Sequence, residues 1–245
     1  MTDSSSVGLW RGPVTQLPIH PELDPLDIPA LRDLARFGVM ADDQLARRYA
    51  DSVFGFNRLL QLKEARVVSR WREALEGSRV YSPTRLGRLI AGVSGVHPRT
   101  TYPSHLAHDV AVVDLADHLL AHNAGQRWLA EDEVREFLDH VEPPPRRVPG
   151  DVRHRPDGLL LDGTYRIGIE LEHSDKFEDR YTRISAWFVR EWRVDRVRWY
   201  VDNPRIIQRL RQINSQHGFD HDMTIEIESF PPGVRLRQRA GRFES

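Results

Sequence analysis

The chain has 245 residues, of which 40% are hydrophobic and 29% charged, and its net charge is -1, as in a globular protein large enough for one or two domains. It contains no cysteine, which excludes disulfides and thiolate metal sites. No apolar run approaches the ~18 residues of a membrane-spanning helix, and the first residues lack the basic-then-apolar order of a signal peptide, so we expect a cytoplasmic protein. Lys63 and Lys176 are the only lysines among 35 basic residues; the remainder are arginines, which bind phosphate well through their forked guanidinium.

Residues 1–26 are rich in Ser, Pro and Gly without any period, which predicts a loose arm. Five elements with the periods of helices and strands follow. They are helices at residues 27–38, 41–50 and 53–65 and strands at residues 66–71 and 78–83. Three helices and then a two-stranded ribbon are the order of a winged helix-turn-helix, whose third helix enters the major groove of DNA. We therefore predict a winged-helix DNA-binding domain over residues 27–95.

The third helix of this segment has a polar face suited to base and phosphate contacts. The predicted DNA-binding residues on this helix and on the ribbon are Asn57, Arg58, Gln61, Lys63, Arg70 and Arg79. The alternative is a small three-helix domain that serves packing alone. A closing helix is predicted after the ribbon, capped by Ser82 with Pro83 at its first position.

The second half alternates helical and strand periods, which predicts a mixed-sheet domain over residues 104–232. Its predicted helices and strands are a helix at 104–122, strands at 126–134, 155–161 and 164–172, a helix at 176–191, a strand at 196–202, a helix at 204–214 and a strand at 223–230. Residues 142–150 are a proline-rich loop, and residues 233–245 form a basic tail. The predicted fold class is α/β (α+β overall).

Asp162-Gly163 stands between two apolar runs and signals a two-residue hairpin turn. Such a turn would place Asp157 opposite Gly168. Because faces alternate along a strand, Glu170 and Glu172 would share one face of the sheet with Asp157. Asp157 and Glu170 would then be diagonal neighbours ~7 Å apart, with room beside Gly168 for a divalent ion bound by both carboxylates. Glutamates on a solvated strand are the alternative.

The spacing of Glu170 and Glu172 also occurs in Glu226 and Glu228 on a later predicted strand. That second pair lacks the accompanying aspartate, turn and glycine, so it serves as a comparison for the first pair. The helix after the hairpin has an apolar stripe, which we expect to be buried, next to a basic stripe. The apolar stripe is Phe177, Tyr181, Ile184 and Phe188, and the basic one includes Lys176, Arg180, Arg183 and Arg190. The basic stripe either stabilises a negatively charged substrate or is an ordinary solvated face.

The stretch "RPDGLLL…GIELE" resembles the core of PD-(D/E)XK nucleases, in which an aspartate and a following glutamate hold Mg²⁺ beside a lysine. The order from about Asp27 to Phe230, winged helix first and nuclease-like core second, is similar to that of the replication-relaxation family of plasmid and other mobile-element proteins. The resemblance implies a PD-(D/E)XK nuclease-like domain, duplex DNA as partner and Mg²⁺ or Mn²⁺ as cofactor. It further implies Asp157 and Glu170 as metal ligands, with Glu131 as a further ligand.

The sequence departs from the nuclease pattern at one position, because Glu172 stands where that pattern has lysine. Either Lys176, or Arg180 and Arg183, supplies the missing positive charge, or Glu172 helps to hold a second metal ion, or hydrolysis has been lost. Arginine stays protonated, so Lys176 is the better substitute in proton transfer. The expected catalytic set is therefore Asp157, Glu170, Glu172 and Lys176.

The sequence offers several other candidate functional residues. His118 and His122 stand at a spacing that can bind zinc, but a third ligand is not evident. His108 either faces the carboxylates or caps and packs its helix, and we favour the second. Trp71, Trp187, Trp192 and Trp199 serve either as core residues or as anchors of a protein interface.

Two functions follow from these expectations. The first is a DNA-binding protein of plasmid or mobile-element replication or mobilisation with a metal-dependent endonuclease or nickase centre. The second is a non-catalytic replication or transcription factor whose nuclease-like domain is inactive and used for assembly. The expected partners are double-stranded DNA and, beyond it, a second copy of the chain or replication and mobilisation proteins.

Overall fold

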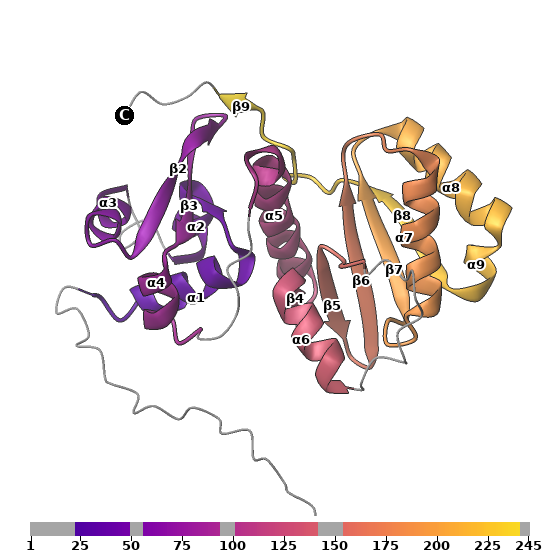
Figure 1. The fold of residues 1–245 in the computed structure, drawn as a ribbon, viewed down its shortest axis with the longest axis horizontal. Coiled ribbons are helices and arrows are strands. Elements are labelled where there is room, and N and C mark those ends of the chain that lie inside the picture. The colour runs from indigo at the N-terminus through magenta and orange to yellow at the C-terminus, as the bar shows by residue number, and fades with distance from the viewer. Residues whose placement is uncertain (1–22, 50–55, 94–100, 142–153, 241–245) are drawn as a thin grey trace, which may run out of the picture.

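The computed structural model describes residues 23–49, 56–93, 101–141 and 154–240. It combines α-helices with one four-stranded and one five-stranded sheet (Figure 1). Most of the predicted arm at residues 1–26 and the whole predicted loop at residues 142–150 lie outside the described residues. The fold is thus a mixed α and β structure.

The N-terminal part contains the three predicted helices and the predicted ribbon. Its elements are α1 (Asp27–Phe37), β1 (Met40–Ala41), α2 (Asp42–Tyr49), α3 (Phe56–Glu64), β2 (Val68–Leu75), β3 (Ser78–Pro83) and α4 (Arg85–Ile90). The four-stranded sheet has the order β1-β3-β2-β9 with antiparallel neighbours. Buried Leu31, Leu34, Leu59 and Leu62 from α1 and α3 belong to the same apolar cluster as Tyr81 of β3, so the helices pack on the ribbon.

The ribbon and the helix after it differ from the prediction in two details. The strand β2 continues to Leu75, with an irregularity in its pairing between Arg70 and Ala74. The helix α4 begins at Arg85 and not at Pro83, because the Thr84 side chain accepts a hydrogen bond from the Gly87 backbone N–H at 3.1 Å and caps the helix. The prediction that Ser82 caps this helix is therefore wrong.

The second part is built on a five-stranded mixed sheet of order β4-β5-β6-β7-β8. Its elements are a 3₁₀ turn η1 (Pro103–His105), α5 (Leu106–His122), β4 (Arg127–Ala130), α6 (Glu131–Val141), β5 (Gly158–Asp162), β6 (Tyr165–Glu172), α7 (Glu178–Arg190), β7 (Arg196–Val201), α8 (Pro204–His217), α9 (Phe219–Asp222) and β8 (Thr224–Ser229). The pairs β4·β5 and β5·β6 are antiparallel, whereas β6·β7 and β7·β8 are parallel. The ribbon view places α5 on one side of this sheet and α7 and α8 on the other (Figure 1), and the buried Val134 and Leu138 of α6 belong to the same apolar cluster as Tyr181 and Phe188 of α7.

The predicted strand at residues 126–134 is wrong in its second half, where α6 begins at Glu131. Acidic residues in the first turn of a helix are stabilised by the helix dipole, and Glu133 also accepts a hydrogen bond from the Ala130 backbone N–H at 2.9 Å. Val134 and Leu138, four residues apart, are both buried against the sheet. The acidic start and this apolar spacing are the signals that identify the helix.

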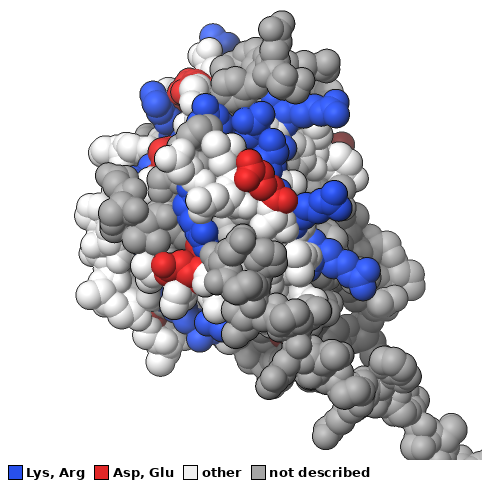
Figure 2. All heavy atoms as spheres, turned by 90° about the vertical axis from the view of Figure 1, so that its left-hand side faces the viewer, with Lys and Arg blue, Asp and Glu red and all other residues white. Residues whose placement is uncertain are grey.

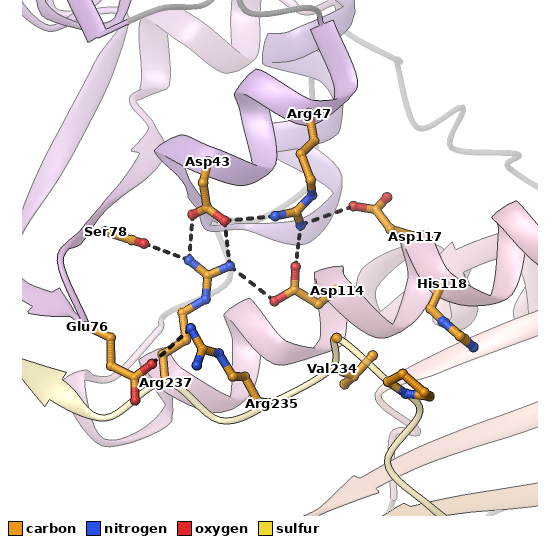
Figure 3. Close-up of a pocket in the computed structure, with 12 residues that line it drawn as sticks. Asp43, Arg47, Glu76, Ser78, Asp114, Asp117, His118, Val234, Arg235 and Arg237 are labelled. Carbon is orange, nitrogen blue, oxygen red and sulfur yellow. Dashed lines mark hydrogen bonds and ion pairs between the residues drawn. The ribbon is translucent and has the colours of Figure 1, made fainter.

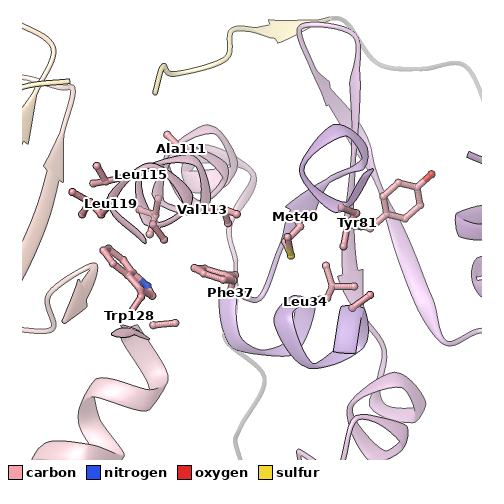
Figure 4. Packing of buried hydrophobic residues seen from close by; sticks show 14 of the residues in the cluster. Leu34, Phe37, Met40, Tyr81, Ala111, Val113, Leu115, Leu119 and Trp128 are labelled. Atoms are coloured by element: carbon pink, nitrogen blue, oxygen red, sulfur yellow. The ribbon is translucent and has the colours of Figure 1, made fainter. Parts of the chain in front are cut away.

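The helix α5 joins the two parts of the molecule. Apolar residues point from it in all directions, and a helix of that kind is stable only when it is surrounded. Figure 4 shows α5 between Phe37, Met40 and Tyr81 on one side and Trp128 on the other, and all of these belong to one apolar cluster. In the part of the chain that the structure describes, no helix is long and apolar enough to cross a membrane, α5 included.

The C-terminal segment returns from the five-stranded sheet to the N-terminal part. Its last described residues form β9 (Arg239–Ala240), which pairs with the end of β2. Arg237 lies between the two parts: it donates hydrogen bonds to Asp43 of α2 at 2.8 Å and to Asp114 of α5 at 3.2 Å (Figure 3). Arg237 and Asp114 are buried. The segment predicted as a basic tail is thus partly bound to the body of the protein.

Candidate functional site

A cleft of about 700 Å³ opens at the end of β6, beside the starts of α6 and α7. Six of the predicted site residues line it: Glu131, Asp157, Glu170, Glu172, Lys176 and Arg180. The predicted catalytic and metal-binding residues therefore meet in one place. Arg183 is not among the lining residues; it is exposed, and its Nε donates to the backbone oxygen of Asp179 at 3.1 Å.

The hairpin turn lies one residue later than predicted. Asp162 pairs with Tyr165, so that Gly163 and Thr164 form the turn. Gly163 takes a φ of 58°, the positive value that both common two-residue hairpin turns require at their first central position and that glycine adopts without strain. As a result, Gly168 lies opposite Leu159, and the predicted pairing of Gly168 with Asp157 is wrong.

The shared face of the acids survives this shift in register, because the register changes by two positions and faces alternate with a period of two. Continuing the observed pairing beyond Gly158 places Asp157 opposite Glu170. The surroundings of that face differ from the prediction, however. The space beside Gly168, assigned to a metal ion, is filled by the ring of Phe188 from α7, which a Cβ at Gly168 would meet. The acid-bearing face is therefore the one covered by α7.

Polar contacts hold both carboxylate oxygens of Asp157. One carboxylate oxygen accepts a hydrogen bond from the Leu171 backbone N–H at 2.8 Å, and the other lies 3.0 Å from Nε2 of His108. His108 thus faces the carboxylates, the alternative that sequence reasoning ranked second. The ring of His173 lies 5.9 Å from that of His108, centroid to centroid, and burial together with this neighbour lowers the pKa of His173.

Glu170 pairs with His154, whose Nε2 lies 2.6 Å from Oε1 of the glutamate. Burial raises the pKa of Glu170 to about 7, even though His154 acts in the opposite direction. Burial alone would lower the pKa of His154, but the Glu170 carboxylate more than compensates and raises it. The rings of Trp187 and Phe188 pack edge-on against His154 at 5.4 and 5.6 Å, which keeps this pair in an apolar environment.

Lys176 reaches the site from the loop before α7, and its ammonium forms an ion pair with Glu172. Glu172 is 2% exposed and also accepts hydrogen bonds from the backbone N–H groups of His173 and Ser174, at 3.2 and 3.1 Å. The hydroxyl of Tyr181 accepts from the Lys176 backbone N–H and donates to the Ser174 backbone oxygen, both at 3.2 Å. The loop is thus anchored so that a lysine approaches the carboxylates although the strand carries glutamate.

The donor chemistry of the cleft fits a divalent ion, because Asp157 and Glu170 offer carboxylate oxygens of the kind that Mg²⁺ and Mn²⁺ prefer. Among the described residues, however, no three His, Asp or Glu side chains already surround a common point as a metal site would require. Instead, Asp157 contacts His108 and Glu170 contacts His154. Glu131 lies 3.8 Å from Arg155 in an ion pair. Side-chain rotation away from these partners would accompany the binding of an ion.

Sequence reasoning missed His154 and His173 as residues of the cleft. A signal was present, since His154 precedes Asp157 by three residues and His173 follows Glu172 directly. No protein-family model matches the chain, and no curated protein matches its sequence.

Arg180 and Arg183, also predicted to bind DNA, lie on α7, whereas the other predicted DNA-binding residues lie on α3 and the ribbon of the N-terminal part, the side of the molecule that Figure 2 presents. Basic side chains outnumber acidic ones on that face. Asn57, Gln61 and Lys63 are exposed on α3, as a helix that reads a groove requires. Arg70 of β2 and Arg79 of β3 are half-buried.

Arg58 differs from the other predicted residues of α3. Its Nε donates to Asp27 at 3.0 Å and its Nη1 to Gln61 at 2.8 Å, and Asp27 at the start of α1 is fully buried. The geometry therefore gives Arg58 a structural role between α3 and α1.

His118 and His122 lie side by side near the end of α5, with ring centroids 4.2 Å apart. The Nδ1 atom of His122 lies 2.7 Å from the backbone oxygen of His118. Burial and the neighbouring His122 lower the pKa of His118. A third ligand does not join them among the described residues.

Proposed function

We propose that this chain binds DNA and hydrolyses a phosphodiester bond in the cleft at the end of β6. In this proposal the N-terminal part is a winged helix-turn-helix and the five-stranded sheet is the core of a PD-(D/E)XK nuclease-like domain. The chain is then a member of the replication-relaxation type, acting in the replication or mobilisation of a plasmid or other mobile element with duplex DNA as partner.

One observation carries the proposal: Asp157, Glu170 and the ammonium of Lys176 meet in one cleft although Lys176 is not on the strand. A lysine near two carboxylates supplies the charge that a phosphate requires during hydrolysis. The exposed polar residues of α3 support the DNA-binding half of the proposal.

The residues have separate roles in this proposal. Asp157 and Glu170 would hold Mg²⁺ or Mn²⁺ in place of their contacts with His108 and His154, and Lys176 would lie beside the scissile phosphate. When bound, the ion acidifies the attacking water and offsets charge on the leaving oxygen. Glu172 fixes the position of Lys176 through the ion pair and is itself held by the backbone N–H groups that follow it.

A nicking assay tests the proposal. We expect the protein to convert supercoiled plasmid to open circles with Mg²⁺ or Mn²⁺, and expect Asp157→Asn, Glu170→Gln and Lys176→Met each to lower the rate by about 100-fold or more. Glu228→Gln is the matched control, because Glu228 belongs to the similarly spaced pair on β8 and is half exposed. Equal survival of the plasmid with wild type and the Asp157→Asn/Glu170→Gln double variant would exclude hydrolysis.

The second candidate function is a non-catalytic DNA-binding replication or transcription factor. It is favoured by Glu172, which stands in the lysine position and already pairs with Lys176. It predicts salt-sensitive binding to duplex DNA together with an intact plasmid in the nicking assay. Binding of both wild type and the double variant with equal affinity, without any nicking, would select this candidate.

A further inference from the structure

Phe177 is exposed in a way that its sequence pattern does not predict. It was expected in the buried stripe of the helix, but 90% of its surface is exposed, whereas Tyr181, Ile184 and Phe188 are buried. Phe177 precedes α7 with an extended backbone, φ -61° and ψ 145°, so it does not follow the helical stripe. A phenylalanine left in water forgoes the stabilisation that burial would give, which makes an exposed one informative.

Its position connects Phe177 to the cleft. The residue before it, Lys176, and the residue three positions after it, Arg180, both line the cleft, and the Arg180 backbone N–H bonds to the Phe177 backbone oxygen at 2.9 Å. Phe177 therefore stands at the rim. Glu178 and Asp179 follow it in the first turn of α7, where the helix dipole offsets their charge.

A second exposed aromatic ring belongs to the cleft itself. Tyr102, just before η1, lines the cleft and is 58% exposed. Its ring contacts that of His105 edge-on, with 6.0 Å between centroids. One exposed ring thus lines the space that also contains the cations of Arg155, Lys176 and Arg180, and the exposed Phe177 directly follows Lys176 in the chain.

Exposed rings next to arginine and lysine are the combination that binds unpaired nucleotides, because every base offers a flat face to stack on and every nucleotide a phosphate. Paired bases inside a duplex are stacked on each other and do not offer that face. A protein partner would favour continuous apolar surface around the rings, whereas here the neighbours are charged.

We propose that the cleft binds single-stranded DNA, with unpaired bases stacked on Phe177 and Tyr102 and the backbone phosphates held by Arg155 and Arg180. This inference rests on the proposed function and names its substrate: a strand that is unpaired where it passes the carboxylates. Duplex contacts belong to α3, and the cleft receives the unpaired strand.

The test is the binding of a fluorescein-labelled oligothymidylate, followed by anisotropy at low salt with EDTA present so that hydrolysis cannot intervene. We expect Phe177→Ala and Tyr102→Ala each to weaken binding on the order of tenfold or more, because stacking on one ring contributes at least that factor. We expect Phe177→Trp to retain affinity and its indole fluorescence to fall when the strand binds. These rings are exposed, so the variants keep the fold.

Tyr165→Ala is the matched control. Tyr165 is also an exposed aromatic, 48%, but it stands at the hairpin turn at the opposite end of β6, with the Arg196 guanidinium over its ring at 4.3 Å. We expect this variant to bind like wild type. Equal affinities of Phe177→Ala, Tyr102→Ala and Tyr165→Ala would overturn the inference, as would no binding of the oligothymidylate at low salt.

The outcomes separate this inference from the proposed hydrolysis. Ring-dependent binding together with an intact plasmid would remove hydrolysis and support the single-strand site. Nicking of the plasmid, together with oligothymidylate binding that does not depend on Phe177 and Tyr102, would support hydrolysis and overturn the proposed single-strand site. A tighter and equally ring-dependent complex with oligouridylate would assign the cleft to RNA and overturn the assignment to DNA.

Discussion

Glu170 is an acid whose charge conflicts with its surroundings. It is 6% exposed, and its partner His154 packs against the ring of Phe188. Desolvation disfavours its ionised form, so its pKa rises to about 7. A residue that costs stability when charged is a candidate for function, since such perturbed groups gather at functional sites.

The titration of Glu170 predicts how stability changes with pH. Because the folded state keeps a proton that the unfolded state has already lost, the stability that Glu170 contributes is lost as pH rises through about 7. His154, whose pKa is also raised, changes stability in the same direction. We expect wild type and Glu170→Gln to differ little near about pH 5, and the variant to be more stable by about 1–3 kcal/mol near about pH 8.

Urea unfolding of both proteins across that pH range measures this difference, and Mn²⁺ provides a second readout. Above about pH 7, an ion bound at Glu170 stabilises wild type by mass action but not Glu170→Gln. A stability difference that stays constant from low to high pH would mean that Glu170 is ionised throughout.

Among the elements, α3 contains both residues held in structural contacts and residues exposed to solvent. Arg58 reaches back to the buried Asp27, whereas Lys63 near the other end of the helix is exposed. The polar face seen in the sequence could not separate these roles, because the separation depends on where α1 lies.

Substitutions in α3 distinguish the two roles. We expect Lys63→Gln to leave the free energy of unfolding within about 0.5 kcal/mol of wild type and to weaken duplex binding while lowering its salt dependence. Arg58→Gln should instead destabilise the fold by about 2–4 kcal/mol, because it leaves the carboxylate of Asp27 buried without its guanidinium.

Thermal unfolding and anisotropy titrations of duplex DNA at two salt concentrations check both expectations. Lys63→Gln with unchanged DNA affinity at low salt would remove α3 from the proposed interface. An Arg58→Gln protein as stable as wild type would remove the structural role of Arg58.

The sequence predicted the positions of helices and strands better than the tertiary contacts of their side chains. Helical and strand periods located α1, α2, α3 and the ribbon, because these depend on local patterns of apolar residues. The turn at Gly163 was placed one residue too early, since Asp-Gly fits two positions of the turn and the flanking strands decide between them. The contact of His108 with Asp157 was only the less favoured alternative, and that of His154 with Glu170 was missed, because both contacts join residues far apart in the chain.

At the scale of the whole molecule, one core and one returning segment hold the two sheets together. The apolar cluster around α5 includes residues from both parts. The C-terminal segment adds β9 to the edge of β2, and the Glu76 backbone N–H bonds to the Gln238 backbone oxygen at 2.9 Å. Pairing of this kind also covers a strand edge that would otherwise be open to association. Composition alone described this segment as basic and could not show what it contacts.

Arg237 makes the main polar contacts of the C-terminal segment, and loss of its guanidinium should weaken the attachment of this segment. Beyond Asp43 and Asp114, Arg237 donates to the Ser78 hydroxyl at 2.8 Å, so one guanidinium joins α2, α5 and the ribbon. We expect Arg237→Gln to lower the free energy of unfolding by about 2–3 kcal/mol. The loss should be smaller than for a buried carboxylate that keeps no partner, because Asp114 keeps its contact with Arg47. Amide hydrogen exchange at Glu76 should become faster as β9 leaves β2.

Arg235 provides the control in the same segment. Its side chain is 72% exposed and lies 3.4 Å from Glu76 in a surface ion pair, so Arg235→Gln should change stability by less than about 1 kcal/mol and leave exchange at Glu76 as in wild type. If Arg237→Gln and Arg235→Gln behaved alike in both measurements, the buried guanidinium would not be what holds the segment. A selective effect of Arg237→Gln would mean that the returning segment fixes the N-terminal part against α5, since Arg237 contacts α2 on one side and α5 on the other.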